Sequence, residues 1–121
     1  MRVDLAPGYS ISRIIKGGWQ LALGHSGVPP RAQAHADMAA FVDKGITTFD
    51  CADIYTGVEE LIGSFQPPAG RSLQVHTKYV PDLATLDSVD LAVTGAIIER
   101  SRHRLRRDAL DLVQFHWWDY S

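Results

Sequence analysis

The sequence is poor in cysteine, has no long apolar run and carries no excess of either charge. Its one cysteine, Cys51, excludes an internal disulfide bond and fits a reducing compartment. No run of 18 apolar residues is present, and the first ten residues lack the apolar core of a signal peptide. Twelve Lys and Arg against 14 Asp and Glu argue against general polyanion binding. We therefore expect a cytoplasmic protein that binds neither nucleic acid nor a membrane.

Strand-like and helix-like segments alternate along the 121 residues. Short β-branched and aromatic runs predict strands, and apolar residues spaced by three and four predict helices. The predicted strands are 10–15, 46–49, 73–77 and 110–115, and the predicted helices are 31–44, 56–65 and one that starts at 87 or 88. Strict alternation indicates an α/β fold with parallel strands and helical crossovers. Residues 1–10 are expected to be extended or turn-forming, and no linker marks a second domain.

Two features are predicted to shape the helix ends. Thr56 and Glu59 have the spacing of a capping box, in which both side chains bond the backbone at a helix start. An arginine-rich run, 100–107, resembles a solvated helix end, where positive charge offsets the helix dipole. Nucleic-acid binding through that run is the weaker alternative.

Polar side chains follow the predicted strands at the point where each strand ends. Asp50, Lys78 and His116 each come at the C-terminal end of a different strand, and Tyr55 lies in the loop just beyond Asp50. The C-terminal ends of parallel strands form the rim at which barrels and open α/β sheets build their sites. We expect a catalytic site at this rim.

These residues lie in motifs that resemble the aldo-keto reductase family. The motifs are GGW after the first strand, FDCADIY, VHTK and RLRRDALDLVQFHW, and they occur in the family's order across essentially the whole chain. The resemblance implies a (β/α)8 TIM-barrel fold, of which residues 1–121 form about the first four β/α units. It also implies an NAD(P)-dependent oxidoreductase that interconverts aldehydes or ketones with alcohols, with NADPH preferred to NADH.

The same resemblance implies roles for particular residues. The implied catalytic tetrad is Asp50, Tyr55, Lys78 and His116. The implied cofactor contacts are Gly17, Gly18, Trp19 and Asp50, and the implied substrate contacts are Trp19, Tyr55, His116 and Trp117. No metal site is expected, because the other histidines show no ligand-like spacing with acids or with Cys51.

The tetrad suits carbonyl reduction on general chemical grounds. Hydride delivery to a carbonyl leaves an alkoxide that needs a proton, and a tyrosine phenol is a reluctant donor near neutral pH. A lysine ammonium close to the phenol favours the phenolate, so Lys78 is expected to activate Tyr55. Asp50 is expected to keep that lysine charged and oriented. His116, when neutral, is suited to donating a hydrogen bond to the carbonyl oxygen.

Each residue also has a purely structural interpretation. Asp50 and Lys78 are compatible with a structural ion pair, and His116 with a core or capping histidine. Trp117 and Trp118 are compatible with core aromatic residues. Four polar residues at one rim nevertheless favour a site. Cys51 is expected to be a small buried residue rather than a nucleophile.

Three other functional hypotheses stay open. Lys78 is chemically able to act as the Schiff-base lysine of an aldolase, although the spacing of Asp50 and Tyr55 argues against it. A non-catalytic regulatory subunit of the same fold would bind nucleotide and sense redox state. We also expect a half-barrel to expose strand edges, so that the chain alone is unstable, inactive or self-associating. The third hypothesis is therefore an assembly module that pairs two half-barrels.

Overall fold

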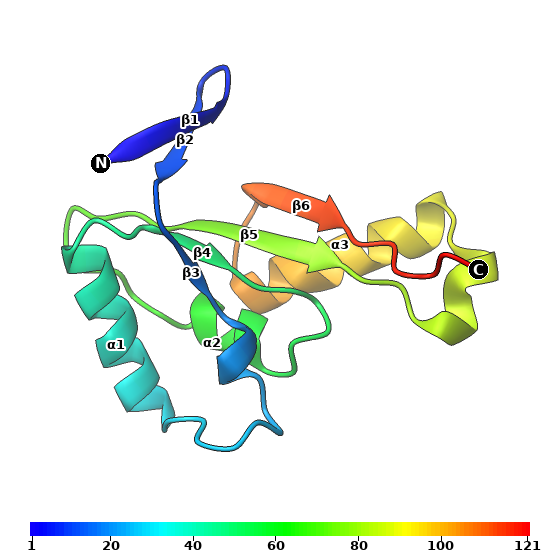
Figure 1. Ribbon diagram of the computed structural model, residues 1–121, viewed down its shortest axis with the longest axis horizontal. Helices are drawn as coiled ribbons and strands as arrows, with labels where there is room; N and C mark the ends of the chain where they lie inside the picture. Colours follow the sequence, from blue (N-terminus) through cyan, green and yellow to red (C-terminus); the bar gives the residue numbers. More distant parts are fainter.

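The computed structural model describes residues 1–121 and contains a four-stranded parallel sheet (Figure 1). The strands are β3 (Ile15–Gly17), β4 (Thr48–Asp50), β5 (Gln74–Tyr79) and β6 (Leu112–Phe115), and they pair in that order. Every neighbouring pair is parallel. The predicted α/β fold is therefore confirmed, with each crossover placing the next strand beside the previous one.

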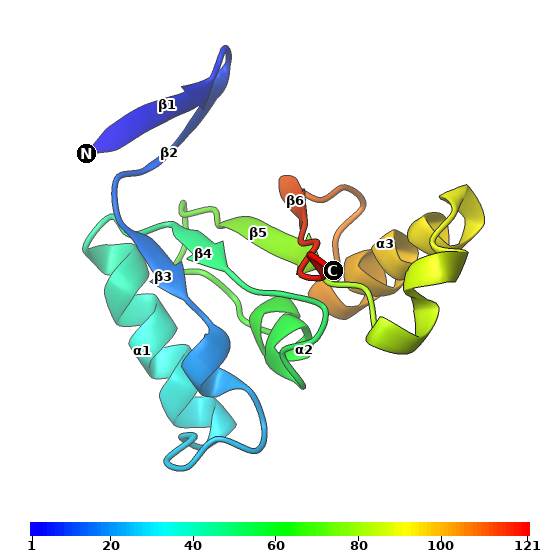
Figure 2. The ribbon, with the colours of Figure 1, turned by 45° about the vertical axis from the view of Figure 1, so that its right-hand side comes forward.

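Three α-helices lie on one side of the sheet, as the two ribbon views show (Figures 1 and 2). They are α1 (Arg31–Asp43), α2 (Val58–Gly63) and α3 (Leu91–Leu105), with the 3-10 turns η1 (Trp19–Leu21) and η2 (Leu83–Ser88) between them and the strands. None of the helices is long and apolar enough to cross a membrane.

The hydrophobic core lies between the sheet and these helices. Phe49 and Val75 project from the sheet and join Met38 of α1, Ile62 of α2 and Leu105 of α3 in one buried cluster. Burial of this apolar surface is what holds the layers together. Successive side chains of a strand point to opposite faces, and Phe49 and Val75 occupy the helix-facing positions of β4 and β5.

The end of β6 departs from this alternation of buried and exposed side chains. The same alternation would place Phe115 under the helices, but Phe115 is 55% exposed and lies beside the rings of Tyr79 and Trp117. Phe115 stands at the end of β6, the last strand of the sheet, which has no further strand on its outer side.

The first twelve residues differ from the prediction. They form an antiparallel hairpin of β1 (Arg2–Ala6) and β2 (Tyr9–Ser12), and the strand predicted over 10–15 is divided between β2 and β3. Gly8 supplies the turn with a φ of 76°. The Ser12 hydroxyl accepts bonds from the amides of Thr47 and Thr48, which ends β2 against the sheet. Such a break depends on a distant partner and leaves no local signal.

The hairpin is bonded to the face of the sheet opposite the helices (Figures 1 and 2). The Tyr9 hydroxyl lies 2.9 Å from His76 Nε2, and Arg2 donates to Thr47 Oγ1 at 3.1 Å and to Gln74 Oε1 at 2.7 Å. Tyr9 and Arg2 belong to the hairpin, His76 and Gln74 belong to β5, and Thr47 lies just before β4. The hairpin therefore covers one end of this face and leaves the end with Asp50 and Lys78 open.

We expect folding to weaken at acid pH because of His76. Burial lowers the pKa of His76, the nearby Asp50 and Asp111 oppose that shift, and Lys78 reinforces it. A histidine with a lowered folded-state pKa binds fewer protons when folded, so its stability contribution is complete above its unfolded pKa of about 6.5 and is lost as pH falls below it. Urea unfolding at pH 7.5, 6.5 and 5.5 should show a steeper decline for the native chain than for His76→Gln. Parallel declines would contradict this role.

Two predicted helix starts are wrong. The Thr56–Glu59 capping box is absent: Gly57 caps α2 with a φ of 80°, and no side chain caps that end. The helix predicted from 87 or 88 begins instead after Asp90, whose carboxylate accepts from the Val93 amide at 2.7 Å. Both errors have one cause, since several residues near a helix start can act as caps and tertiary contacts decide which one does.

Candidate active site

Asp50 and Lys78 meet at the C-terminal ends of two adjacent strands. The Lys78 ammonium lies 2.6 Å from both carboxylate oxygens of Asp50 and donates to the Cys51 carbonyl at 2.9 Å. The side chains are 16% exposed for Lys78 and 30% exposed for Asp50. All three N–H donors of the ammonium therefore have an acceptor, which fixes its position.

Tyr55 lies next to this ion pair. Its half-buried ring has the Lys78 ammonium 5.6 Å from its centroid. The backbone around it is bonded on both sides, from the Tyr55 amide to the Ala52 carbonyl and from the Val58 amide to the Tyr55 carbonyl. The structure thus brings together Asp50, Tyr55 and Lys78, with the ammonium near both the carboxylate and the phenol ring.

His116 stands at the same rim, one strand further along the sheet. Its amide donates to the Tyr79 carbonyl at 2.9 Å, which continues the β5–β6 ladder past the end of β6. The side chain is exposed and forms no hydrogen bond with the other three residues. It lines a hollow of about 350 Å³ together with Ile54, Leu83 and Trp118.

The tryptophans take different positions. Trp118 lines the hollow beside His116, and its indole N–H donates to the Pro81 carbonyl at 2.8 Å. Trp117 packs near Phe115, with the ring centroids 6.1 Å apart. Trp19 is 54% exposed and meets His25 edge-on. From sequence Trp118 was interpreted as a core aromatic residue and was given no part in the site.

Gly18 is packed against the strand that carries Asp50. A Cβ at Gly18 would lie 2.8 Å from the Asp50 carbonyl oxygen and 2.9 Å from Val58 Cγ1, whereas a Cβ at Gly17 would meet nothing within 4 Å. The second glycine therefore allows close approach of two backbones, and the first leaves open space at the sheet edge.

We expect Gly18→Ala to destabilise the fold and Gly17→Ala to have little effect. The added methyl group at residue 18 contacts a backbone carbonyl, which cannot move without shifting β4 and Asp50, and such overpacking costs about 1–3 kcal/mol. Urea unfolding of both variants provides the comparison. Equal free energies of unfolding would show that the space between residue 18 and the Asp50 carbonyl tolerates a methyl group.

Cys51 is fully buried beside the site. Burial raises the pKa of its thiol to about 12, so the thiolate is scarce at neutral pH. The residue acts as a core filler, as predicted, and offers no nucleophile to the rim.

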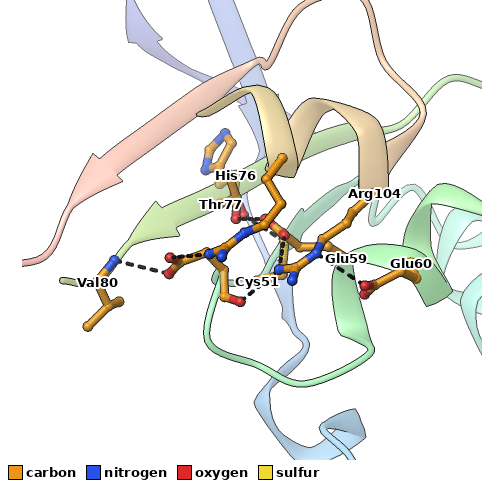
Figure 3. A network of polar contacts seen from close by, with 9 residues as sticks. Cys51, Glu59, Glu60, His76, Thr77, Val80 and Arg104 are labelled. Atoms are coloured by element: carbon orange, nitrogen blue, oxygen red, sulfur yellow. Dashed lines mark hydrogen bonds and ion pairs between the residues drawn. The ribbon is translucent and has the colours of Figure 1, made fainter. Parts of the chain in front are cut away.

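A buried polar cluster connects α2, β5 and α3 through Glu59, Thr77 and Arg104 (Figure 3). Glu59 has no exposed surface, accepts from Thr77 Oγ1 at 2.7 Å and pairs with Arg104 at 3.3 Å. Arg104 also pairs with Glu60 at 3.2 Å. This cluster was not predicted from the sequence, in which Glu59 matches a helix cap and Arg104 a solvated helix end. A usable signal was the spacing of four between Arg100 and Arg104, which places both on one side of α3.

Comparisons with known proteins agree with this architecture. The model described as the aldo/keto reductase family matches residues 13–121. A structure from Pseudomonas aeruginosa assigned to the aldo-keto reductases superposes with a TM-score of 0.82 at 24% identity, covering 99% of this chain and 47% of that one. An aldo/keto reductase from Brucella melitensis gives a TM-score of 0.68 at 23% identity and covers 97% and 40% of the two chains.

A glycerol dehydrogenase from Gluconobacter oxydans is also similar, with a TM-score of 0.70, 28% identity and coverage of 93% of this chain and 37% of that one. No curated protein matches significantly. The chain thus spans less than half the length of the solved structures it resembles, and its parallel sheet corresponds to part of a (β/α)8 barrel, as predicted.

Proposed function

The chain belongs to the aldo/keto reductase family, and on that premise we propose that it carries the catalytic residues of an NAD(P)-dependent oxidoreductase that interconverts carbonyl compounds and alcohols. The observation that supports this most directly is the Lys78 ammonium that lies near both the Asp50 carboxylate and the Tyr55 ring. Residues 1–121 correspond in this proposal to the first half of one barrel domain.

Each of the four residues has a distinct task in the proposed reaction. Tyr55 donates a proton to the carbonyl oxygen during reduction and accepts it back during alcohol oxidation. Lys78 places its positive charge beside the ring of that tyrosine while the proton is transferred, and Asp50 orients Lys78. His116, beside the hollow that Ile54 and Trp118 line, donates a hydrogen bond that orients the carbonyl.

The edge near β3 fits a flat cofactor ring. Gly17 leaves the space beside its Cα open, and Trp19 exposes about half of its surface. Gly17, Gly18, Trp19 and Asp50 are the residues proposed to hold the nicotinamide end. The nicotinamide supplies the hydride when it is bound. NADPH rather than NADH is the proposed cofactor, on the basis of the resemblance to the family.

The aldolase alternative is less well supported. A Schiff base requires a free amine, whereas the Lys78 nitrogen is bonded to both oxygens of Asp50 and to the Cys51 carbonyl. The regulatory alternative predicts cofactor binding without turnover, so one experiment separates it from the reductase.

Self-association is proposed as the chain's means of covering its sheet edges. The outer strands β3 and β6 each have one unpaired edge, and Ile14, Ile15 and Phe115 expose apolar surface there. Unpaired edges with apolar side chains favour pairing with another strand. The mass in solution tests this directly, since a monomer at micromolar concentration contradicts it.

Cofactor binding followed by turnover tests the proposed function. NADPH and NADH are titrated separately and followed by nicotinamide fluorescence, and aliphatic and aromatic aldehydes are then added while absorbance at the reduced-nicotinamide band is recorded. Saturable binding with aldehyde-dependent oxidation supports the reductase, and tighter binding of NADPH supports the cofactor choice. Binding without turnover favours the regulatory alternative, and no binding by the folded chain contradicts both.

A further inference from the structure

Asp53 lies between Asp50 and Tyr55 in the sequence and has no role in the reaction proposed above. Its side chain is only 3% exposed, which is unusual for a carboxylate in a loop. A buried carboxylate is costly unless hydrogen bonds and cations compensate for its lost hydration. The contacts of Asp53 therefore indicate what this burial achieves.

The first set of contacts joins Asp53 to the strand that carries Lys78. Its carboxylate accepts from the Val80 amide at 3.0 Å, and its own amide donates to the Lys78 carbonyl at 3.0 Å. The two bonds lie on either side of Tyr79. They fix the loop against the end of β5, at the residue whose side chain faces Tyr55.

The second set joins the same residue to α3. Arg100 pairs with the Asp53 carboxylate at 3.3 Å, and Arg104 donates to the Asp53 carbonyl at 3.1 Å. The two arginines are one helical turn apart and thus approach the loop together. Arg104 also binds Glu59 and Glu60, so the loop, α2 and α3 share one set of cations.

From these contacts we propose that Asp53 is a positioning residue: together with Arg100 and Arg104 it holds the loop so that the Tyr55 phenol stays beside Lys78. This inference rests on the proposed function of Tyr55 and Lys78. A small displacement of a catalytic group weakens catalysis strongly, because the reacting atoms must be aligned closely. Tyr55 is only two residues away from this anchor, and its own side chain has Lys78 as its charged neighbour.

Opposing effects act on the pKa of the Asp53 carboxyl group. Burial raises the pKa of Asp53, the bond from the Val80 amide and the Arg100 guanidinium lower it, and Glu59 raises it further. A neutral isostere therefore removes the ion pair without changing the shape, and truncation removes every contact of the carboxylate. The variants Asp53→Asn and Asp53→Ala separate these two contributions.

Amide hydrogen exchange tests the proposal without any need for enzyme activity. We expect exchange at residues 51–57 and at Val80 to rise at least ten-fold in Asp53→Ala, by less in Asp53→Asn and Arg100→Gln, and to stay unchanged in α1. The matched control is Arg102→Gln, because Arg102 lies on the same helix but pairs with the exposed Glu99. Unchanged exchange in the loop, or an equal rise throughout the chain, would overturn the positioning role.

Kinetics provide the second readout. In an active chain, Asp53→Asn should lower kcat about ten-fold and leave the KM of the aldehyde within about two-fold. The reason is that the substitution displaces the Tyr55 hydroxyl group and leaves the hollow beside His116 unchanged. A change confined to KM overturns the proposal. If the native chain reduces no carbonyl, the proposed function fails, and the exchange pattern alone then decides whether Asp53 fixes the loop.

Discussion

Tyr55→Phe is expected to lower aldehyde reduction about 10²- to 10⁴-fold while leaving NADPH binding nearly unchanged. The substitution removes one hydroxyl group from a half-buried ring and preserves the ring that stands beside the Lys78 ammonium. In the proposed reaction this hydroxyl is the proton donor, so its removal should leave the developing alkoxide without a proton source.

The matched control for this prediction is Tyr120→Phe. The same hydroxyl group is removed from a side chain that is 89% exposed, and activity should stay within about two-fold of the native value. Steady-state rates and cofactor titrations of both variants test this prediction. Retention of more than half of the native rate by Tyr55→Phe would exclude this tyrosine as the proton donor.

The largest effect on stability is expected from Arg104→Met. Methionine preserves most of the aliphatic volume but leaves the Glu59 carboxylate, which has no exposed surface, without its cation. Removing one partner of a buried pair costs about 3–5 kcal/mol, a large part of the total stability of a small domain. Urea unfolding measured by circular dichroism should show this loss in the free energy of unfolding.

Two further variants test the cause of that loss. Arg102→Met removes the cation that pairs with the exposed carboxylate of Glu99 on the same helix and should cost no more than about 1 kcal/mol. Glu59→Gln combined with Arg104→Met removes the uncompensated charge, so the double variant should be more stable than Arg104→Met alone. Equal losses for Arg102→Met and Arg104→Met would show that burial of the Glu59 charge is not the reason.

Local patterns were sufficient wherever one segment contained the whole signal. The helix predicted over 31–44 agrees with α1, because its apolar spacing and the glycine that follows it are both local. The strands that end near Asp50, Lys78 and His116 were also predicted, since short apolar runs mark buried parallel strands. Parallel pairing then places these strand ends at one rim.

Local patterns failed where a side chain had several partners to choose from. Glu59 matches a cap in the sequence, but it bonds Thr77 and Arg104, two residues that are distant along the chain. Asp53 stood inside a recognised motif without a role until its bonds to Val80 and Arg100 were visible. Hydrogen-bond partners of this kind depend on packing, which a short segment does not encode.

The sequence by itself determined the order of strands and helices and the placing of Asp50, Tyr55, Lys78 and His116 near strand ends, because apolar periodicity and chain order are local properties. The tertiary structure alone decided that the Lys78 ammonium lies near both Asp50 and Tyr55, that the amino-terminal hairpin is bonded to the face of the sheet opposite the helices, and that Trp118 lines the hollow beside His116. The physical reason is that distances between side chains from different elements are set by how the layers pack, and packing is a property of the whole fold.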